Sequence, residues 1–442
     1  MSDHLEVWID TDIFGSPHLV GRLYHDRGQV RFAYESSWIK NPAAFLIDPD
    51  LSLDSGSFYP KPDSGNFGVF LDSSPDRWGQ TLMKRREAIE AKDTGRKPRN
   101  LYAWDFLIGV QDETRQGALR FKRPGEETFL ATDPLPAPPV TSLAELESIA
   151  VELSSKRLDN LDLLRRWLSV LVAPGASLGG ARPKANFRDI DGSLWIAKFP
   201  ARDDVIDVGA WEYVAHQLSM SAGINVPAAR LVRLGNEHRT FCIKRFDREN
   251  NHRVFYSSAM TLMNKTQSEG SSYLDIASFI QSNGVDGHIK NDLEQLFRRV
   301  VFNVLIGNRD DHLRNHGFIL KKDGWILSPA FDVNPNIDKQ DHVLNLDEID
   351  NRPNLDSVLH THEWYGLGET YARRIVDEVI SALTPWQQVA ERCRVSRSEI
   401  ELMAAAFSEL PNQEETVYTH VPVMPSTLDE TDYPTGPKPE DR

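Results

Sequence analysis

Cysteine is scarce in this chain, since only Cys242 and Cys393 occur among 442 residues. Two thiols cannot form a disulfide framework, so a reducing cytoplasm is the expected compartment. The sequence also lacks an apolar run long enough to cross a bilayer, and residues 1–12 lack the basic and then apolar layout of a secretory signal. Positive charge is not in excess either, because the formal net charge is −15. This balance argues against direct binding to nucleic acid.

The length of the chain exceeds what one hydrophobic core usually organises, so several domains are expected. Prolines between residues 124 and 139 predict a linker, because proline fixes φ and removes a hydrogen-bond donor. The C-terminal segment is rich in proline and acidic groups and is predicted to lack order. These features divide the chain into residues 1–123, a linker 124–141, a mixed region 142–247, a helical region 248–410 and a tail 411–442.

Periodicity predicts the elements of each part. In the N-terminal part, two strands flank a turn at residues 26–28 and a helix follows. Further helices, and then a strand, helix and strand pattern, are expected in the middle of the chain. The predicted strands are 19–24, 29–34, 194–199, 229–234 and 240–246, and the predicted helices are 76–92, 142–154, 161–171 and 208–222.

The strongest chemical signal is a polar loop that follows a helix with apolar residues at helical spacing between Leu293 and Leu305. Gly307 is a natural stop for that helix. Asp310 and Asn315 then have the D-x-x-x-x-N spacing of kinase catalytic loops, in which the aspartate acts on the attacking hydroxyl and the asparagine binds Mg²⁺.

A hairpin at residues 317–327 is predicted to deliver Asp332, whose carboxylate is costly to bury unless it binds a partner or a metal. A hard oxygen ligand for Mg²⁺ explains that position well. The spacing alone also arises by chance, because Asp and Asn cap turns in many loops. A zinc hydrolase is a further alternative, since His312 and His316 are four residues apart and flanked by carboxylates.

A second group of residues suits the phosphates of a nucleotide. Lys198 lies within the otherwise apolar strand predicted at 194–199, and Glu212 on the next helix is its candidate partner. The alternative is a lysine that extends from a sheet edge into water. Upstream lies a glycine-rich segment, 174–184, whose glycines allow the backbone to approach phosphates closely. The strand at 240–246 ends where a hinge between two lobes is expected.

Taken together, these motifs resemble the HipA family, the serine/threonine-kinase toxins of bacterial type II toxin–antitoxin modules. The resemblance spans roughly residues 5–410. It is carried by the segments 71–79, 177–184, 196–200, 223–227, 245–248, 310–315 and 328–332. The fold that it implies is an α+β, two-lobed kinase-like fold related to phosphoinositide kinases, with an added N-terminal α/β subdomain and a mostly helical C-terminal lobe.

The resemblance also implies site roles. Asp310 would be the catalytic base, and Asp311 has no assigned role. The residues implied to bind Mg²⁺ and ATP are Asn315 and Asp332 as metal ligands, Lys198 and the loop residues Ser177, Gly179, Gly180 and Lys184 at the phosphates, and Lys244 and Phe246 at the adenine. Ser177 matches the serine that members of the family autophosphorylate, which ejects the phosphate loop and silences the kinase.

Family substrates are aminoacyl-tRNA synthetases, whose phosphorylation stalls translation. Family partners are small helix-turn-helix antitoxins that carry the contact to operator DNA, which agrees with the acidic charge of this chain. The expected function is therefore a toxin protein kinase that uses ATP and Mg²⁺. The alternative is a catalytically silent ATP-binding co-repressor that acts with its antitoxin.

Overall fold

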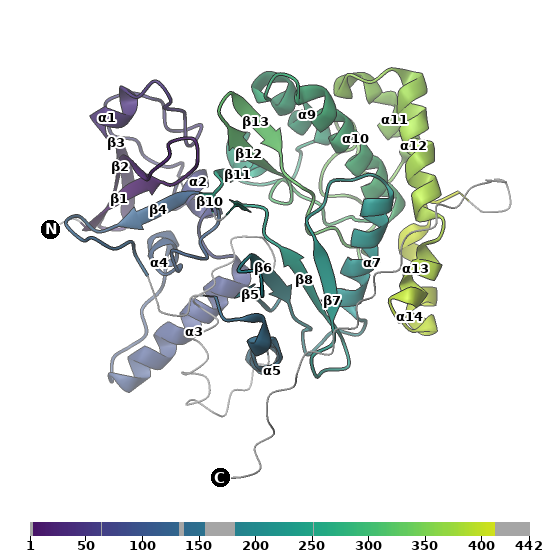
Figure 1. The fold of residues 1–442 in the computed structure, drawn as a ribbon, viewed down its shortest axis with the longest axis horizontal. Coiled ribbons are helices and arrows are strands. Elements are labelled where there is room, and N and C mark those ends of the chain that lie inside the picture. Colours follow the sequence, from purple (N-terminus) through teal and green to yellow (C-terminus); the bar gives the residue numbers. More distant parts are fainter. Residues whose placement is uncertain (1–2, 63, 132–136, 155–181, 251, 412–442) are drawn as a thin grey trace, which may run out of the picture.

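The computed structural model describes residues 3–62, 64–131, 137–154, 182–250 and 252–411. Figure 1 shows an N-terminal sheet on one side, a second sheet near the centre and a stack of helices on the opposite side. Ser177, Gly179, Gly180, the helix predicted at 161–171 and the tail from residue 412 lie outside the described residues. Within the described ranges, no helix has the length and apolar character needed to cross a membrane.

The N-terminal subdomain is built on an antiparallel sheet in the order β3-β2-β1-β4. Its strands alternate buried and partly exposed side chains, so one face packs on a core rich in aromatic residues. The turn expected at residues 26–28 joins β2 to β3, with Arg27 and Gly28 both at positive φ. The elements are β1 (Asp3–Ile9), β2 (His18–Asp26), β3 (Gln29–Tyr34), α1 (Ser36–Ile39), α2 (Gly68–Asp72), α3 (Arg77–Asp93), α4 (Ala103–Ile108) and β4 (Leu119–Lys122).

The central lobe holds an antiparallel sheet in the order β5-β6-β8-β7. Helix α7 packs on one face of this sheet, while apolar residues of α3 and α5 pack on the other. The N-terminal subdomain therefore contributes directly to the core of this lobe. The elements are η1 (Val140–Ser142), α5 (Leu143–Ser154), β5 (Lys184–Arg188), β6 (Leu194–Lys198), α7 (Val208–Ser221), β7 (Ala229–Val232) and β8 (Thr240–Lys244).

The C-terminal lobe is mostly helical and is organised around α10, most of whose side chains are buried. A three-stranded sheet in the order β11-β12-β13 lies beside it. The elements are β9 (Arg248–Glu249), β10 (His252–Arg253), β11 (Tyr256–Ser258), α8 (Ala259–Leu262), α9 (Tyr273–Asn283), α10 (Ile289–Leu305), β12 (Gly317–Lys321), β13 (Gly324–Leu327), α11 (Leu355–His360), η2 (His362–Tyr365), α12 (Glu369–Leu383), α13 (Trp386–Arg392), α14 (Arg397–Met403) and η3 (Ala404–Phe407).

The elements that lead into the predicted catalytic loop are confirmed. Helix α10 ends at Leu305, and Gly307 has φ +65°. This left-handed conformation commonly ends helices and favours glycine over residues that have a side chain. The hairpin predicted at residues 317–327 is β12 paired with β13. The sequence did not predict β11, which pairs with β12 and extends the hairpin to three strands.

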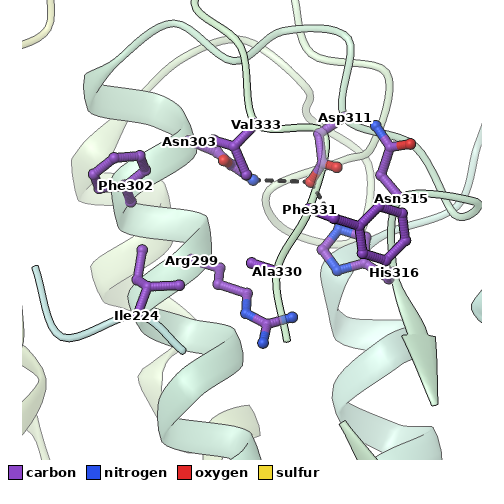
Figure 2. A pocket seen from close by; sticks show the side chains of 10 residues that line it. All are labelled: Ile224, Arg299, Phe302, Asn303, Asp311, Asn315, His316, Ala330, Phe331 and Val333. Atoms are coloured by element: carbon purple, nitrogen blue, oxygen red, sulfur yellow. Dashed lines mark hydrogen bonds and ion pairs between the residues drawn. The ribbon is translucent and has the colours of Figure 1, made fainter. Parts of the chain in front are cut away.

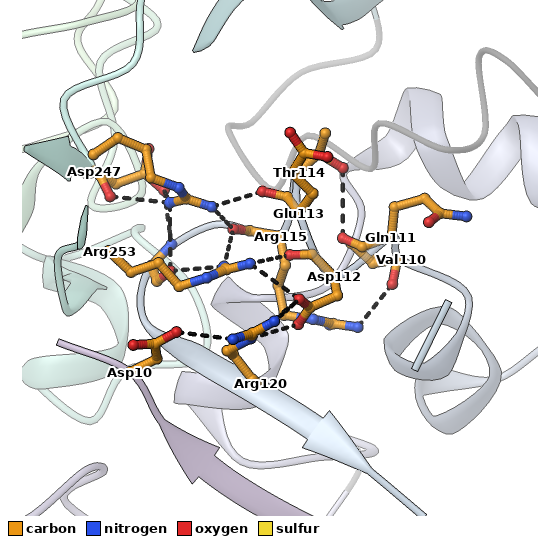
Figure 3. Close-up of polar contacts among 12 residues, drawn as sticks. Asp10, Val110, Gln111, Asp112, Glu113, Thr114, Arg115, Arg120, Asp247 and Arg253 are labelled. Atoms are coloured by element: carbon orange, nitrogen blue, oxygen red, sulfur yellow. Dashed lines mark hydrogen bonds and ion pairs between the residues drawn. The ribbon is translucent and has the colours of Figure 1, made fainter. Parts of the chain in front are cut away.

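Buried polar contacts fasten the N-terminal subdomain to both lobes. In Figure 3, carbonyl groups of residues 112–115 and the Asp112 carboxylate meet arginines from the segment after β8. Arg245 donates to the Thr114 carbonyl at 2.6 Å and to Asp247 Oδ2 at 2.6 Å, and the Gly117 N–H donates to Asp247 Oδ2 at 2.8 Å. Burial would raise the pKa of Asp247, but Arg245 and Arg248 lower it well below its usual range. The segment predicted as a hinge therefore also forms the contact with the N-terminal subdomain.

Candidate active site

The lysine predicted to hold phosphates lies between two carboxylates. Lys198, the last residue of β6, forms an ion pair with Glu212 of α7, and its Nζ lies 2.5 Å from Asp332 Oδ1. Glu212 reaches Lys198 because α7 begins ten residues after β6 and packs back onto the central sheet. The predicted partnership of Lys198 with Glu212 is confirmed, and Asp332 is brought to the same ammonium from 134 residues away.

Opposing charges set the protonation of this trio. Burial alone would lower the pKa of Lys198, but Asp332 and Glu212 outweigh it and raise the pKa above its ordinary value. Burial would raise the pKa of Asp332, but the attraction of Lys198 keeps it below the ordinary value. The pKa of Glu212 is raised, chiefly because its carboxyl is buried. Lys198 and Asp332 are therefore held as an ion pair at neutral pH.

Asp332 has a left-handed backbone, with φ +57°. A residue other than glycine rarely adopts this conformation, although aspartate tolerates it better than most. Such positions cluster at functional sites, where the surrounding structure holds them in place. Here the preceding Phe331 packs against Phe246, with ring centroids 5.6 Å apart, which holds the segment beneath the end of β8.

The twin aspartates after α10 have different environments. The Asp310 side chain is 60% exposed and forms an ion pair with Lys339. The Asp311 side chain is buried and accepts hydrogen bonds from Tyr273 Oη at 2.6 Å, His316 Nε2 at 2.7 Å and Asn303 Nδ2 at 2.8 Å. The role of Asp311, which sequence reasoning left open, is therefore to fasten the loop to α9 and α10.

Figure 2 shows this anchor: Asp311 points toward Asn303 of α10, and His316 lies below it beside Phe331. Burial would raise the pKa of Asp311, but the charge and hydrogen bond of His316 and the hydroxyl of Tyr273 lower it. A carboxylate with three buried donors is a stable anchor, whereas an exposed carboxylate remains accessible to a substrate hydroxyl. Asp310 is therefore the better candidate for the base, because its carboxylate is exposed and that of Asp311 is engaged by buried donors.

Asn315 lines the same small pocket as Asp311, His316 and Phe331. Its Oδ1 atom is buried and accepts no hydrogen bond from any residue in the described ranges. A buried amide oxygen without a donor is costly, and a hard cation would satisfy it. Asp332 lies in the chain between Phe331 and Val333, which line the same pocket, and the Asn315 and Asp332 side chains would together offer oxygen donors that fit Mg²⁺.

The zinc alternative finds little support in the geometry. His316 Nε2 is hydrogen-bonded to Asp311. The Asp311 carboxylate is buried and accepts three hydrogen bonds, so it is poorly available as a zinc ligand. Across the part of the chain that the structure describes, no group of three His, Cys, Asp or Glu side chains is placed to hold a metal ion.

One buried contact near the site was missed by sequence reasoning. Lys184 begins β5 directly opposite Lys198 in the sheet register, so the two side chains extend from the same face of the sheet. Asp76, the N-cap of α3, lies 2.7 Å from Lys184 Nζ, and both side chains are almost fully buried. Trp78 Nε1 also donates to the Lys184 carbonyl at 3.1 Å. The N-terminal subdomain thus supplies a carboxylate to the lysine opposite Lys198, over a separation of 108 residues that no local pattern reveals.

The two residues predicted at the adenine differ in placement. Phe246 is partly buried and packs on Tyr256 and Phe331. Lys244 pairs with Trp195 in the sheet, so its side chain lies on the face opposite to Lys198, with its Nζ 3.8 Å from Asp191. The Lys244 ammonium is therefore not brought to the phosphate side of the site.

Comparison with known proteins agrees with this arrangement. Residues 176–387 match the HipA-like C-terminal domain, and residues 11–97 match the HipA N-terminal domain. The structure is similar to that of HipA from Shewanella oneidensis MR-1, solved with HipB and operator DNA, with a TM-score of 0.62 and 16% identity over 92% of this chain and 95% of that one.

Two curated relatives carry provisional kinase names. One, Y4mE of Sinorhizobium fredii, is 24% identical over 357 residues, which cover 74% of this chain and 76% of the relative. The other, from Haemophilus influenzae, is 32% identical over 139 residues, and the match spans 27% of this chain and 39% of the length of that relative.

The fold is therefore α+β and two-lobed, of the kinase-like class, with a lysine, a paired glutamate and an aspartate meeting at the junction of the lobes. The two family models match consecutive parts of the chain and together span more than half of the sequence. This chain belongs to the HipA family.

Proposed function

We propose that the protein is an ATP- and Mg²⁺-dependent serine/threonine protein kinase that acts as the toxin of a toxin–antitoxin pair. The observation that carries the proposal is the convergence of Lys198 on Glu212 and Asp332, with the exposed Asp310 on the loop that precedes the hairpin leading to Asp332. The lysine–glutamate pair and the metal aspartate are the parts that phosphoryl transfer requires, because catalysis there rests on positioning and charge stabilisation.

Each residue has a distinct task in this proposal. Lys198 would bind the α- and β-phosphates of ATP, and Glu212 orients its ammonium. Asn315 Oδ1 and the Asp332 carboxylate would hold Mg²⁺, which when bound neutralises charge on the phosphates. Asp310 would accept the proton of a serine or threonine hydroxyl. Asp311 keeps the loop in place through Tyr273, Asn303 and His316 without touching the reactants.

Some parts of the proposal rest on the family. The similar Shewanella structure contains HipB and operator DNA, which supports a small helix-turn-helix antitoxin as the partner and contact to DNA through that partner alone. An aminoacyl-tRNA synthetase is the proposed class of substrate. Ser177 and its loop neighbours Gly179 and Gly180 remain predicted phosphate-loop residues, with Ser177 as the site of autophosphorylation.

The test is transfer of label from [γ-³²P]ATP with Mg²⁺, first to the protein itself and then to a panel of purified aminoacyl-tRNA synthetases. Mass spectrometry of the labelled chain should locate phosphate on Ser177. The matched controls are Asp310→Asn and Asp332→Asn, which should bind their antitoxin normally and transfer no label. A protein that binds ATP and operator–antitoxin complex but transfers no label would instead be a silent co-repressor.

A further inference from the structure

The exposed carboxylate of Asp310 already has a cation beside it. Lys339 belongs to the segment that follows the metal aspartate, and it forms an ion pair with Asp310 at the surface of the site. The two side chains are 42% and 60% exposed. An exposed ion pair contributes only about 0–1 kcal/mol to stability, so folding gives little reason to place a lysine there.

The backbone around Lys339 is nevertheless held by a set of specific hydrogen bonds. The Asn336 N–H donates to the Gly307 carbonyl at 2.9 Å, which ties the segment to the end of α10. Asn336 Oδ1 then accepts the N–H groups of Asp338 at 2.8 Å and Lys339 at 3.0 Å. The buried Arg309 donates to the Lys339 carbonyl at 2.8 Å. Arg309, the residue before Asp310, therefore holds the backbone of Lys339, whose ammonium contacts Asp310.

The other lysines near the site have partners of their own. Lys198 is engaged by Glu212 and Asp332, and Lys184 by Asp76. Among the described residues, Lys339 is the basic side chain that the structure pairs with Asp310. In phosphoryl transfer, negative charge spreads over the three equatorial oxygens of the moving group, which lie between the attacking hydroxyl and the leaving group. An exposed ammonium next to the candidate base is well placed to meet that charge.

We propose that Lys339 is a further catalytic residue, which aligns Asp310 and contacts the γ-phosphoryl group during transfer. This inference rests on the proposed kinase function. In the step, the bond between the γ-phosphorus and the β,γ-bridging oxygen breaks and ADP leaves with its electron pair. The hydroxyl oxygen of the acceptor forms the new bond to phosphorus, and its proton passes to the Asp310 carboxylate. Lys339 keeps its protons throughout and contributes charge and hydrogen bonds.

The experiment compares wild type with Lys339→Met and Lys339→Arg, using Lys322→Met as the control. Lys322 lies in the exposed turn between β12 and β13. Initial rates of ADP release and of ³²P transfer to myelin basic protein, at varied MgATP, give kcat and KM separately. We expect Lys339→Met to lower kcat by about 30-fold or more, with KM for ATP within about twofold. Lys339→Arg should recover part of kcat, and Lys322→Met should match wild type.

Thermal midpoints and MgATP binding, followed by intrinsic fluorescence, check that each variant is folded. Because the pair is exposed, the midpoint of Lys339→Met should stay close to that of wild type. An unchanged kcat would refute the role of Lys339, and a raised kcat would show instead that the lysine masks the base. A wild type that binds MgATP but transfers nothing would refute the kinase proposal itself, and the role of Lys339 with it.

Discussion

Variants of Asp310 and Asp311 allow effects on stability to be separated from effects on catalysis. Replacing Asp311 by alanine removes a buried carboxylate that accepts three hydrogen bonds, from Tyr273, His316 and Asn303. A hydrogen bond to a charged group contributes about 1.5–3 kcal/mol, and the donors left behind are buried. The three contributions do not add fully because the partners belong to one network. We therefore expect Asp311→Ala to lower the free energy of unfolding by about 3–5 kcal/mol.

Asp310→Asn is the matched variant, because its side chain is 60% exposed and has one surface partner, Lys339. Its effect on the free energy of unfolding should be within about 0.5 kcal/mol. The assay is urea denaturation of both proteins, followed by tryptophan fluorescence and far-ultraviolet circular dichroism, together with label transfer at a temperature where both are folded. We expect Asp311→Ala to be unstable with residual transfer, and Asp310→Asn to be stable without transfer.

The reverse pattern would refute this reasoning. If Asp311→Ala keeps wild-type stability and binds ATP but transfers no label, Asp311 is the base. If Asp310→Asn then transfers label normally, the loop register inferred from the D-x-x-x-x-N spacing is wrong. Both variants are read against wild type in the same denaturation series, so a general loss of folding cannot be mistaken for a loss of chemistry.

Three other perturbations have expected outcomes. Asp76→Asn removes the buried carboxylate charge that faces the Lys184 ammonium and should lower the free energy of unfolding by about 3–5 kcal/mol. Asp54→Asn on the exposed surface should match wild type in the same urea series. Burial lowers the pKa of His342 to about 4, so on acidification the imidazole takes up a proton more readily in the unfolded chain than in the folded one. The free energy of unfolding should therefore fall by about 3 kcal/mol between pH 6.5 and pH 4. His342→Gln should flatten that part of the plot of urea midpoint against pH. Asn315→Ala removes an oxygen without a donor among the described residues, so it should leave stability within about 1 kcal/mol and weaken the Mg²⁺ dependence of ATP binding measured by calorimetry.

Local patterns predicted much of the framework. The apolar spacing between Leu293 and Leu305 is that of a helix buried on most sides, and α10 is such a helix. Gly307 and the hairpin at residues 317–327 were predicted because a helix stop and a tight turn have strong local preferences. The pairing of Lys198 with Glu212 was predicted as well, since a lysine within an apolar strand is costly to bury without a partner.

Contacts between distant segments were not predictable in the same way. Asp76 and Lys184 meet because α3 packs against the central sheet, and neither residue has a local signature for that contact. The contact of Lys339 with Asp310 depends on how the segment after Asp332 folds back onto the end of α10. The different roles of Asp310 and Asp311 follow from which carboxylate faces the core, and the spacing of a doubled aspartate does not contain that information.

The most direct test of the account is label transfer from [γ-³²P]ATP by wild type, Asp310→Asn and Asp332→Asn, each verified to be folded. We predict Mg²⁺-dependent phosphorylation of serine or threonine by wild type alone, abolished by chelation of the metal. Equal labelling by wild type and Asp332→Asn would contradict it, because the ion pair of Asp332 with Lys198 would then have no part in transfer.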